Sequence, residues 1–223
     1  MCARHAILED LSLAHQKKPL EVPSQATYTF PGYLPNGMLH PTFVRAFNRY
    51  YYKQATKKTS PKILTYCNYF YPLDRLHAWP KLYGKRGFLQ YQCVMPNEVA
   101  ASTIQTAFEI LRKKHCPIYL AVLKRLGVEN QAFLSFPCPG LTLAIDLPIR
   151  HPELFLCLDE LDALLIRVGG RVYLAKDARL KPENFREMYP RYAQWLNVKH
   201  QWDPKSIYSS SLSRRLLLTP QTI

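Results

Sequence analysis

The chain has 223 residues, of which 48% are apolar and 21% are charged, so it can bury a sizeable core and is too apolar for wholesale disorder. Its formal net charge of +14 implies anionic neighbours, such as nucleic acid, a membrane surface, a phosphorylated substrate or an acidic partner chain. No apolar run approaches the roughly 20 residues of a membrane-spanning helix, and the N-terminus lacks the continuous apolar core of a signal peptide.

The positions of the basic residues and the spacing of the cysteines narrow the possible partners and the possible sites. Lysine and arginine are dispersed, with short clusters at residues 57–58, 81–86, 112–114 and 214–215. Dispersion of this kind favours a basic proteome or a missing acidic partner over a nucleic-acid groove, so we expect no nucleic-acid partner. The six cysteines show no CxxC and no metal-like spacing with the seven histidines, which predicts reduced thiols and no metal site. Cys138, between two prolines, is predicted to be structural.

The first part of the chain gives few regular signals. Residues 1–25 are interpreted as a lead-in and linker, because "QKKPLEVPSQ" carries prolines that interrupt regular structure. Aromatic and apolar residues from Phe43 to Tyr52 recur at helical spacing. The segment 53–62, "KQATKKTSPK", is polar and basic, and we expect it to be a mobile loop.

A clear pattern begins at residue 87. "GFLQYQCVM" alternates between two faces, which predicts a strand. A helix is expected to follow, with Asn97 as its N-cap and with an apolar stripe. The expected stripe consists of Val99, Ile104, Phe108 and Leu111. "PIYLAVLKRLG" (117–127) predicts the next strand.

A strand, a helix and a further strand are expected again from residue 140 onward. "GLTLAIDLPI" (140–149) predicts a strand, and 151–170 predicts a helix that ends at two glycines. "RVYLAK" (171–176) predicts a short strand, and two terminal helices are expected after residue 181. The order β-α-β-β-α-β indicates an α+β fold with a split βαβ, ferredoxin-like arrangement, in which two helices cover one face of an antiparallel sheet.

Several polar residues occupy these strands. Gln90 and Gln92 share one sheet face, which is either solvent-facing or a polar floor for a hydroxyl-rich ligand, since carboxamides both donate and accept. Lys124 and Asp146 raise the same question on the other strands. "GGRVYLAKDAR" (169–179) offers a similar choice: its charges are solvated, or its tyrosine and first lysine face a polar site.

Three long segments carry a resemblance to a known family. They are "FYPLDRLHAWPKLYGKRGFLQYQCVMP", "NQAFLSFPCPGLTLAIDLPI" and "GGRVYLAKDARLKPENFREMYPRYAQWLNVKHQWDPKSIYSSSLSRRL". They resemble the C-terminal part of FAD-dependent oxidases of the vanillyl-alcohol-oxidase fold, those of the decaprenylphosphoryl-ribose 2-oxidase type, and more distantly the sugar-lactone oxidases. The resemblance covers about residues 25–216 and implies an FAD cofactor.

The resemblance also implies site residues. Tyr173 and Lys176 match the catalytic, flavin-facing pair of the "YxAKD" motif. The substrate-lining positions that match are Gln90, Gln92 and Lys124. Two further pocket positions differ, since the family's "GWNICVD" carries Asn and Cys where this chain has Thr142 and Ala144.

The domain organisation implied by the resemblance is a substrate domain at 26–170 and a C-terminal segment of the FAD-binding domain at 171–223. No phosphate-cradling glycine loop occurs in the sequence, so we expect an N-terminal FAD-binding half to come from elsewhere. The implied activity is hydride transfer from a sugar hydroxyl carbon of a polyprenyl-phosphate sugar or sugar lactone to flavin. The alternative is a non-catalytic remnant or a binding module for an anionic sugar or lipid. We expect a cytoplasmic protein, with contact to the inner face of the membrane as a variant of that expectation.

Overall fold

The computed structural model describes most of the chain and divides it into two compact units. The described residues are 6–21, 27–29, 32–33, 41–56, 63–71, 75–149 and 152–219. The units are Met1–Lys85 and Arg86–Ile223. No helix in this described part of the chain is long and apolar enough to cross a membrane. The expected three-part division at residues 25 and 170 stays a prediction.

Unit 1 contains short elements and one long helix. In chain order they are η1 (Leu8–Asp10), α1 (Leu13–Gln16), β1 (Tyr28–Thr29), α2 (Pro41–Thr56), α3 (Tyr66–Phe70), β2 (Leu76–His77) and η2 (Trp79–Tyr83). Strands β1 and β2 pair in parallel. The predicted helix at Phe43–Tyr52 is confirmed by α2. The predicted loop at 53–62 is wrong at its start, because α2 continues to Thr56, and residues 57–62 lie outside the described residues.

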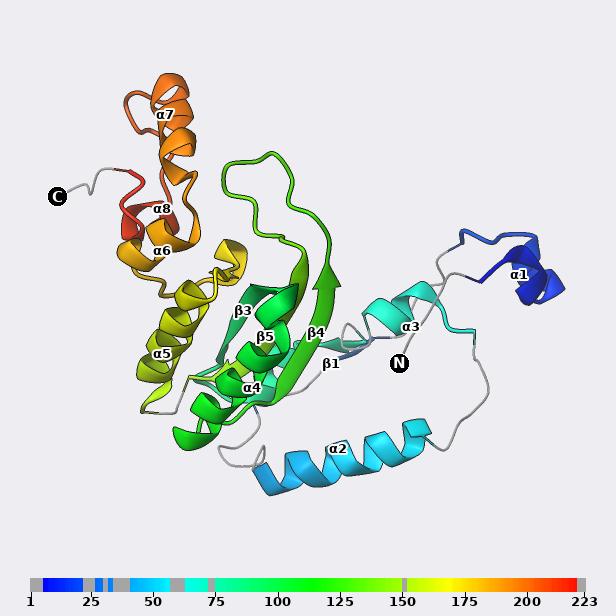
Figure 1. Ribbon diagram of the computed structural model, residues 1–223. Helices are drawn as coiled ribbons and strands as arrows, with labels where there is room; N and C mark the ends of the chain where they lie inside the picture. Colours follow the sequence, from blue (N-terminus) through cyan, green and yellow to red (C-terminus); the bar gives the residue numbers. More distant parts are fainter. Residues whose placement is uncertain are drawn as a thin grey trace. The chain divides into compact units, whose positions relative to one another are not determined.

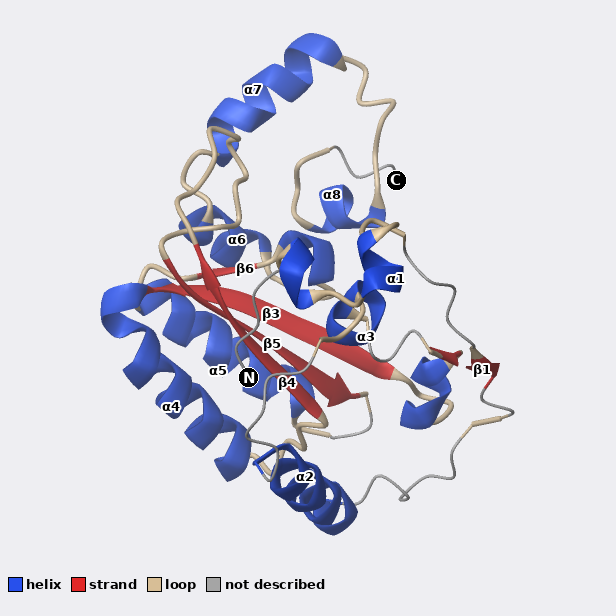
Figure 2. Ribbon diagram, turned by 90° about the vertical axis from the view of Figure 1, so that its right-hand side faces the viewer, coloured by secondary structure: helices blue, strands red, loops and turns tan. Residues whose placement is uncertain are grey.

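Unit 2 is built on a four-stranded antiparallel sheet. Its elements begin with β3 (Phe88–Pro96), α4 (Asn97–Lys113), β4 (Leu120–Leu126), β5 (Gly140–Pro148), α5 (Leu154–Arg167) and β6 (Arg171–Val172). The strand order is β4-β5-β3-β6, with every neighbour antiparallel. Helices α4 and α5 lie side by side on one face of this sheet, as Figures 1 and 2 show. The predicted split βαβ arrangement is confirmed.

The core of unit 2 lies between the sheet and these helices. Alternate residues of β3 and β5 point into it, which are Leu89, Tyr91, Cys93, Met95, Leu143, Ile145 and Leu147. The residues of α4 that are fully buried are Ala100, Thr103, Ala107 and Leu111. The predicted stripe was therefore correct for Leu111 but wrong for Phe108, which is 37% exposed, because small side chains let α4 approach the sheet closely. Asn97 is the first helical residue and not the N-cap, which is Pro96.

Two glycines are required by this packing. A Cβ on Gly140 would stand 1.9 Å from the Met95 carbonyl oxygen, so the β3–β5 pairing needs glycine at that position. Gly169 follows α5 with a φ of 69°, a left-handed conformation that glycine adopts without strain. The predicted end of the helix at this pair is thus confirmed in kind, with the last helical residue at Arg167.

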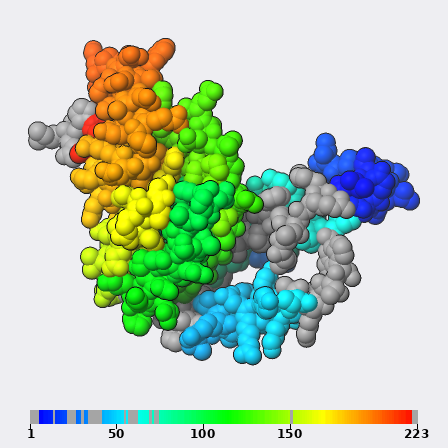
Figure 3. Space-filling model, in the orientation of Figure 1, coloured from blue at the N-terminus to red at the C-terminus, as the bar shows by residue number. Residues whose placement is uncertain are grey.

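The chain after α5 differs from the expectation in two ways. The predicted strand 171–176 is only two residues long and is followed by η3 (Leu174–Lys176). Three terminal helices occur in place of two, namely α6 (Pro182–Met188), α7 (Tyr192–Trp202) and α8 (Ser211–Arg215). Phe185, Tyr189 and Leu216 are buried in the same core as the sheet, so this segment is part of the packed body of unit 2, and Figure 3 shows its orange atoms next to the yellow atoms of α5.

Candidate functional site

The sheet face of unit 2 opposite α4 and α5 carries the polar residues that the sequence singled out. Gln92 pairs with Ala144, and Lys124 pairs with Thr142, in directly opposed register. Because opposed residues of an antiparallel pair point to the same side, the face carries side chains of three strands. Since Gln90 lies two residues before Gln92, five of the seven predicted site residues share this face, which is called the open face because α4 and α5 cover the opposite one. The five are Gln90, Gln92, Lys124, Thr142 and Ala144.

The two glutamines are tied to the neighbouring strand by side-chain hydrogen bonds. Gln90 Nε2 donates to Asp146 Oδ1 at 2.8 Å, and Gln92 Nε2 donates to Thr142 Oγ1 at 3.2 Å. Asp146 and Thr142 are each 1% exposed, whereas both glutamines are only half-buried. Each glutamine carboxamide has two N–H groups and a carbonyl oxygen, so each retains capacity to donate to and accept from a ligand hydroxyl. The face is thus a fixed but unsaturated polar floor.

Tyr173 lies at the edge of this floor. Its backbone N–H donates to the Gln92 carbonyl oxygen at 2.8 Å, which continues the β6–β3 ladder by one residue. Its ring packs against Phe136 with centroids 4.5 Å apart. Phe136 belongs to the loop between β4 and β5, and Arg171 holds that loop by donating to the Ser135 carbonyl oxygen at 2.8 Å. Tyr173 is therefore positioned by two separate parts of the chain.

Lys176 follows in η3, an element that lies next to β3. Its side chain is exposed, and it makes no hydrogen bond or ion pair with any residue that the structure describes. The backbone N–H of Lys176 donates to the Tyr173 carbonyl oxygen at 3.0 Å, so the two residues form one turn. The structure joins Tyr173 to the glutamine strand, while the role of the Lys176 ammonium at this site stays a prediction.

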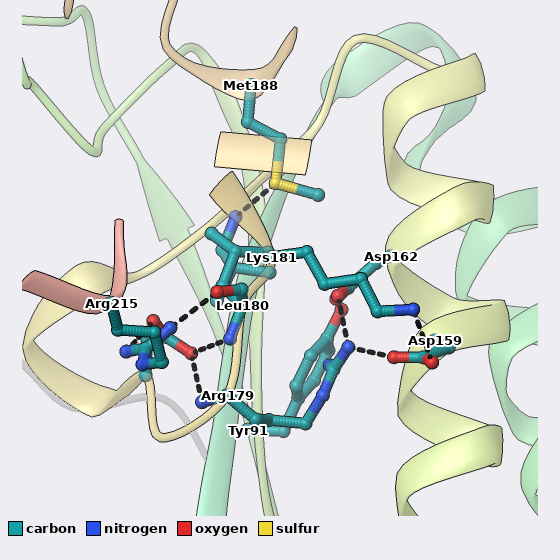
Figure 4. Close-up of polar contacts among 10 residues, drawn as sticks. Tyr91, Asp159, Asp162, Arg179, Leu180, Lys181, Met188 and Arg215 are labelled. Carbon is teal, nitrogen blue, oxygen red and sulfur yellow. Dashed lines mark hydrogen bonds and ion pairs between the residues drawn. The ribbon is translucent and has the colours of Figure 1, made fainter. Parts of the chain in front are cut away.

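The residues after Lys176 are structural, and they hold this turn in place. Asp177 Oδ1 accepts from the backbone N–H groups of Arg179 at 2.8 Å and Leu180 at 2.7 Å. Asp177 Oδ2 accepts from Arg215 Nη2 at 2.7 Å, and the Asp177 side chain is 3% exposed. Figure 4 shows Arg215 of α8 reaching this turn. A solvated role for the whole charge cluster is therefore wrong for Asp177, because its carboxylate is buried and fully used.

Arg179 fastens the same turn to the helix side of the sheet (Figure 4). Its guanidinium pairs with Asp159 and lies 2.8 Å from Asp162 Oδ2. Asp162 Oδ1 accepts from the Tyr91 hydroxyl at 2.9 Å, and Lys181 Nζ donates to Asp159 at 2.9 Å. Asp162 is 0% exposed, and burial raises the pKa of its carboxyl even though Arg179 opposes that shift.

Sequence reasoning missed this buried network. One signal was available, since Asp162 follows Leu158 and Leu161 on the apolar stripe of its helix. An acid at such a position needs a buried partner. Nothing local identified Arg179 as that partner, because the pair is separated by 17 positions and a complete strand.

Burial disfavours the thiolate form of the cysteines in unit 2. Burial raises the pKa of Cys93 to about 12 and also raises the pKa of Cys138. The prediction of a structural Cys138 is consistent with its burial beside Val94 and Phe136. Among the described residues, no group of three His, Cys, Asp or Glu side chains could hold a metal ion. What the open face can do is bind a polar, hydroxyl-bearing ligand with amides and cations.

Known proteins share this sequence over most of its length. The family model described as D-arabinono-1,4-lactone oxidase matches residues 86–216. The chain is 37% identical over 214 residues to the decaprenylphosphoryl-beta-D-ribose oxidase of Mycolicibacterium smegmatis, which covers 96% of this chain and 46% of that protein. It is 42% identical over 144 residues to an uncharacterized protein in the mprA 5'region of Streptomyces coelicolor, which covers 65% of this chain and 38% of that protein. The chain spans less than half the length of both relatives.

Proposed function

This chain belongs to the D-arabinono-1,4-lactone oxidase family, whose members are FAD-dependent oxidoreductases, and we propose that it supplies the sugar-binding part of such an enzyme. The family resemblance drawn from the sequence motifs is thereby confirmed. The proposed substrate is a sugar hydroxyl, in a polyprenyl-phosphate sugar or a sugar lactone. The observation that carries the proposal is the open sheet face, on which Gln90, Gln92, Thr142 and Lys124 converge beside Tyr173.

The residues of this chain fit one side of a flavin. Lys176 is an exposed cation without a partner among the described residues, and Tyr173 is a half-buried aromatic residue next to Gln92. A cation and a phenol suit the polar edge of an isoalloxazine ring. The sequence contains no glycine-rich loop for the diphosphate. In this proposal another stretch of polypeptide, linked or separate, holds the remainder of the FAD.

The roles of the side chains follow from their chemistry. When bound, flavin supplies the hydride acceptor for the carbinol C–H bond. Gln90 and Gln92 hydrogen-bond the sugar hydroxyls, and Lys124 attracts a phosphate group of the substrate. Tyr173 orients the ring of the sugar. Lys176 contacts the reacting hydroxyl and offsets negative charge that develops at the site.

Ala144 lies opposite Gln92, and Thr142 lies two residues before Ala144 on β5, opposite Val94 and Lys124, so these two residues shape the floor next to Gln92. The family motif places a larger amide and a thiol there, so this chain is expected to prefer a different substitution pattern on the sugar. Thr142 already uses its hydroxyl to accept from Gln92, which leaves its methyl group as the feature that limits the space.

Co-expression with a flavin-binding half tests the proposal. The chain is produced with the part of the Mycolicibacterium relative that it does not cover, and the complex is examined for flavin absorption. We expect the chain alone to be colourless and the complex to be yellow. Anaerobic addition of candidate sugars is then expected to bleach the flavin band.

The second candidate, a module that only binds an anionic sugar or lipid, gives the opposite result. In that case the complex either lacks flavin or retains its absorption with every sugar that binds. Calorimetric binding of a sugar to the chain without any bleaching of the complex would overturn the catalytic proposal.

A further inference from the structure

Helix α2 carries exposed aromatic and basic side chains in a part of the sequence that has no acidic residue. Between residues 22 and 73 the sequence contains six lysines or arginines and no aspartate or glutamate. The centre of this stretch is α2, a helix of 16 residues. Its large aromatic side chains, all 56–70% exposed, are Phe43, Phe47, Tyr50, Tyr51 and Tyr52.

Most aromatic residues of α2 lie apart from its basic residues, and Tyr52 is the exception, because it lies about 20° from Arg45 around the helix. Phe43, Phe47 and Tyr50 follow one another at intervals of four and three residues, so they share one face. Arg45, Arg49 and Lys53 recur at intervals of four and form a second stripe that starts two residues later, about 200° around the helix. All three of these basic side chains are exposed.

Contacts recorded for this surface run along the helix itself. Phe47 stacks on Tyr51 with ring centroids 6.2 Å apart, and Gln54 Nε2 donates to the Tyr50 hydroxyl at 3.1 Å. Figure 3 shows the light-blue atoms of α2 on the face in view. Among the residues that the structure describes, neither buried core cluster contains a side chain of α2.

We propose that α2 is an interfacial helix that docks on an anionic lipid bilayer. Phenylalanine and tyrosine suit the boundary between headgroups and acyl chains, because their rings are apolar and the tyrosine hydroxyl can remain hydrated. A basic stripe beside an apolar face is the pattern of helices that lie in the plane of a membrane surface. The three cations have no acidic residue on their own helix to neutralise them, and anionic headgroups supply that charge.

The charge pattern favours lipid over the other occupants of such a face. A second copy of this chain would bring the same acid-free, basic stretch and would repel it. A nucleic acid would satisfy the cations but does not require a continuous aromatic face separate from them. The inference is independent of the proposed oxidation, since α2 belongs to unit 1 and contributes none of the proposed site residues.

Vesicle binding of the purified full chain tests the inference. We expect flotation with phosphatidylcholine vesicles that contain phosphatidylglycerol and little flotation with phosphatidylcholine alone. Hydrogen exchange of the 41–56 peptide is expected to slow when the anionic vesicles are added. Protection of that peptide without vesicles as the protein concentration rises would show a protein interface and overturn the proposal.

Variants separate the helix from the general basic charge of the chain. Arg45→Glu with Arg49→Glu, and separately Phe43→Ser with Phe47→Ser, are expected to weaken binding at least about tenfold. The matched control, Arg112→Glu with Lys113→Glu, makes the same change of charge at two exposed residues of α4 and is expected to bind within about twofold of the original chain. Equal losses in both charge-reversal variants, or binding to oligonucleotides but not to vesicles, would contradict the assignment.

Discussion

The two faces of strand β3 use polar groups in opposite ways. On the helix side, Tyr91 donates to Asp162, which is 0% exposed and paired with Arg179. On the open side, Gln90 and Gln92 are half-buried and keep part of their hydrogen-bonding capacity. Alternation along one strand thus places a buried structural network and the proposed binding surface only one residue apart.

The two faces are also mechanically connected. The turn from Lys176 to Leu180 is tied to the helix side through Arg179 and to α8 through Asp177 and Arg215. The same turn follows Tyr173, whose backbone pairs with Gln92. The buried network should therefore dominate stability, and the open face should dominate ligand binding.

Removing Arg179 has the largest expected effect on stability. Arg179→Ala leaves the buried carboxylate of Asp162 without its charged partner, which costs about 3–5 kcal/mol in the free energy of unfolding. Urea denaturation followed by circular dichroism measures this loss. Arg112→Ala on exposed α4 is the control and should change little. A loss below about 1 kcal/mol for Arg179→Ala would show that Arg179 and Asp162 are not paired in a buried environment in solution.

Asp177 is next in size. Asp177→Ala removes the acceptor of two backbone N–H groups and of Arg215, so we expect a loss of about 2–3 kcal/mol by the same measurement. Asp177→Asn keeps a side-chain oxygen for the N–H groups and should lose less. If the two substitutions were equally destabilising, the charge of Asp177 and not its role in the turn would be responsible.

The pH dependence of stability isolates Asp162. Burial raises the pKa of its carboxyl, so the folded state holds this proton more tightly than the unfolded chain. Its favourable contribution is complete below the ordinary pKa of 3.8 and is lost as the pH rises through the folded value. Relative to Asp162→Asn, the original chain should therefore lose stability from acid toward neutral pH. A difference that is constant with pH would contradict the raised pKa.

The smallest effect on stability is expected on the open face. Gln92→Leu removes one hydrogen bond to Thr142 at a half-buried position and should cost less than about 1 kcal/mol. In the flavin-containing complex the same substitution should weaken sugar binding at least about tenfold, because the carboxamide no longer contacts the hydroxyls. Titration of the two proteins with a sugar that bleaches the flavin measures this difference. Unaltered binding would remove Gln92 from the site.

The sequence predicted the sheet well because its strands alternate strictly. Phe88–Pro96 and Gly140–Pro148 differ from the expected ranges by a residue or so, and the open-face residues followed from their spacing. The end of β6 could not be predicted locally. Met188 accepts from the Val172 N–H at 3.4 Å and the Tyr189 hydroxyl donates to the Val172 carbonyl at 2.6 Å, so side chains from α6 and the residue after it satisfy that strand.

Distant partners explain what else was missed. Arg179 and Asp177 looked like ordinary loop charges because their partners lie in α5 and α8. The roles of Tyr173, Lys176 and the pocket residues came from the family resemblance and not from the pattern of the strands. The proposed role of Lys176 therefore rests on the family resemblance, on the exposure of its side chain and on its place in the turn.

Anaerobic flavin reduction in the complex with a flavin-binding half decides whether the reaction takes place beside the Tyr173–Lys176 turn. The original chain, Lys176→Ala and the control Lys205→Ala, an exposed lysine beyond α7, would be mixed with the sugar that bleaches the flavin. We predict that the Lys205→Ala complex is reduced at the original rate, while the Lys176→Ala complex binds flavin but is reduced at least about a hundredfold more slowly. Equal reduction rates in all three complexes would contradict the placement of the reaction beside the Tyr173–Lys176 turn.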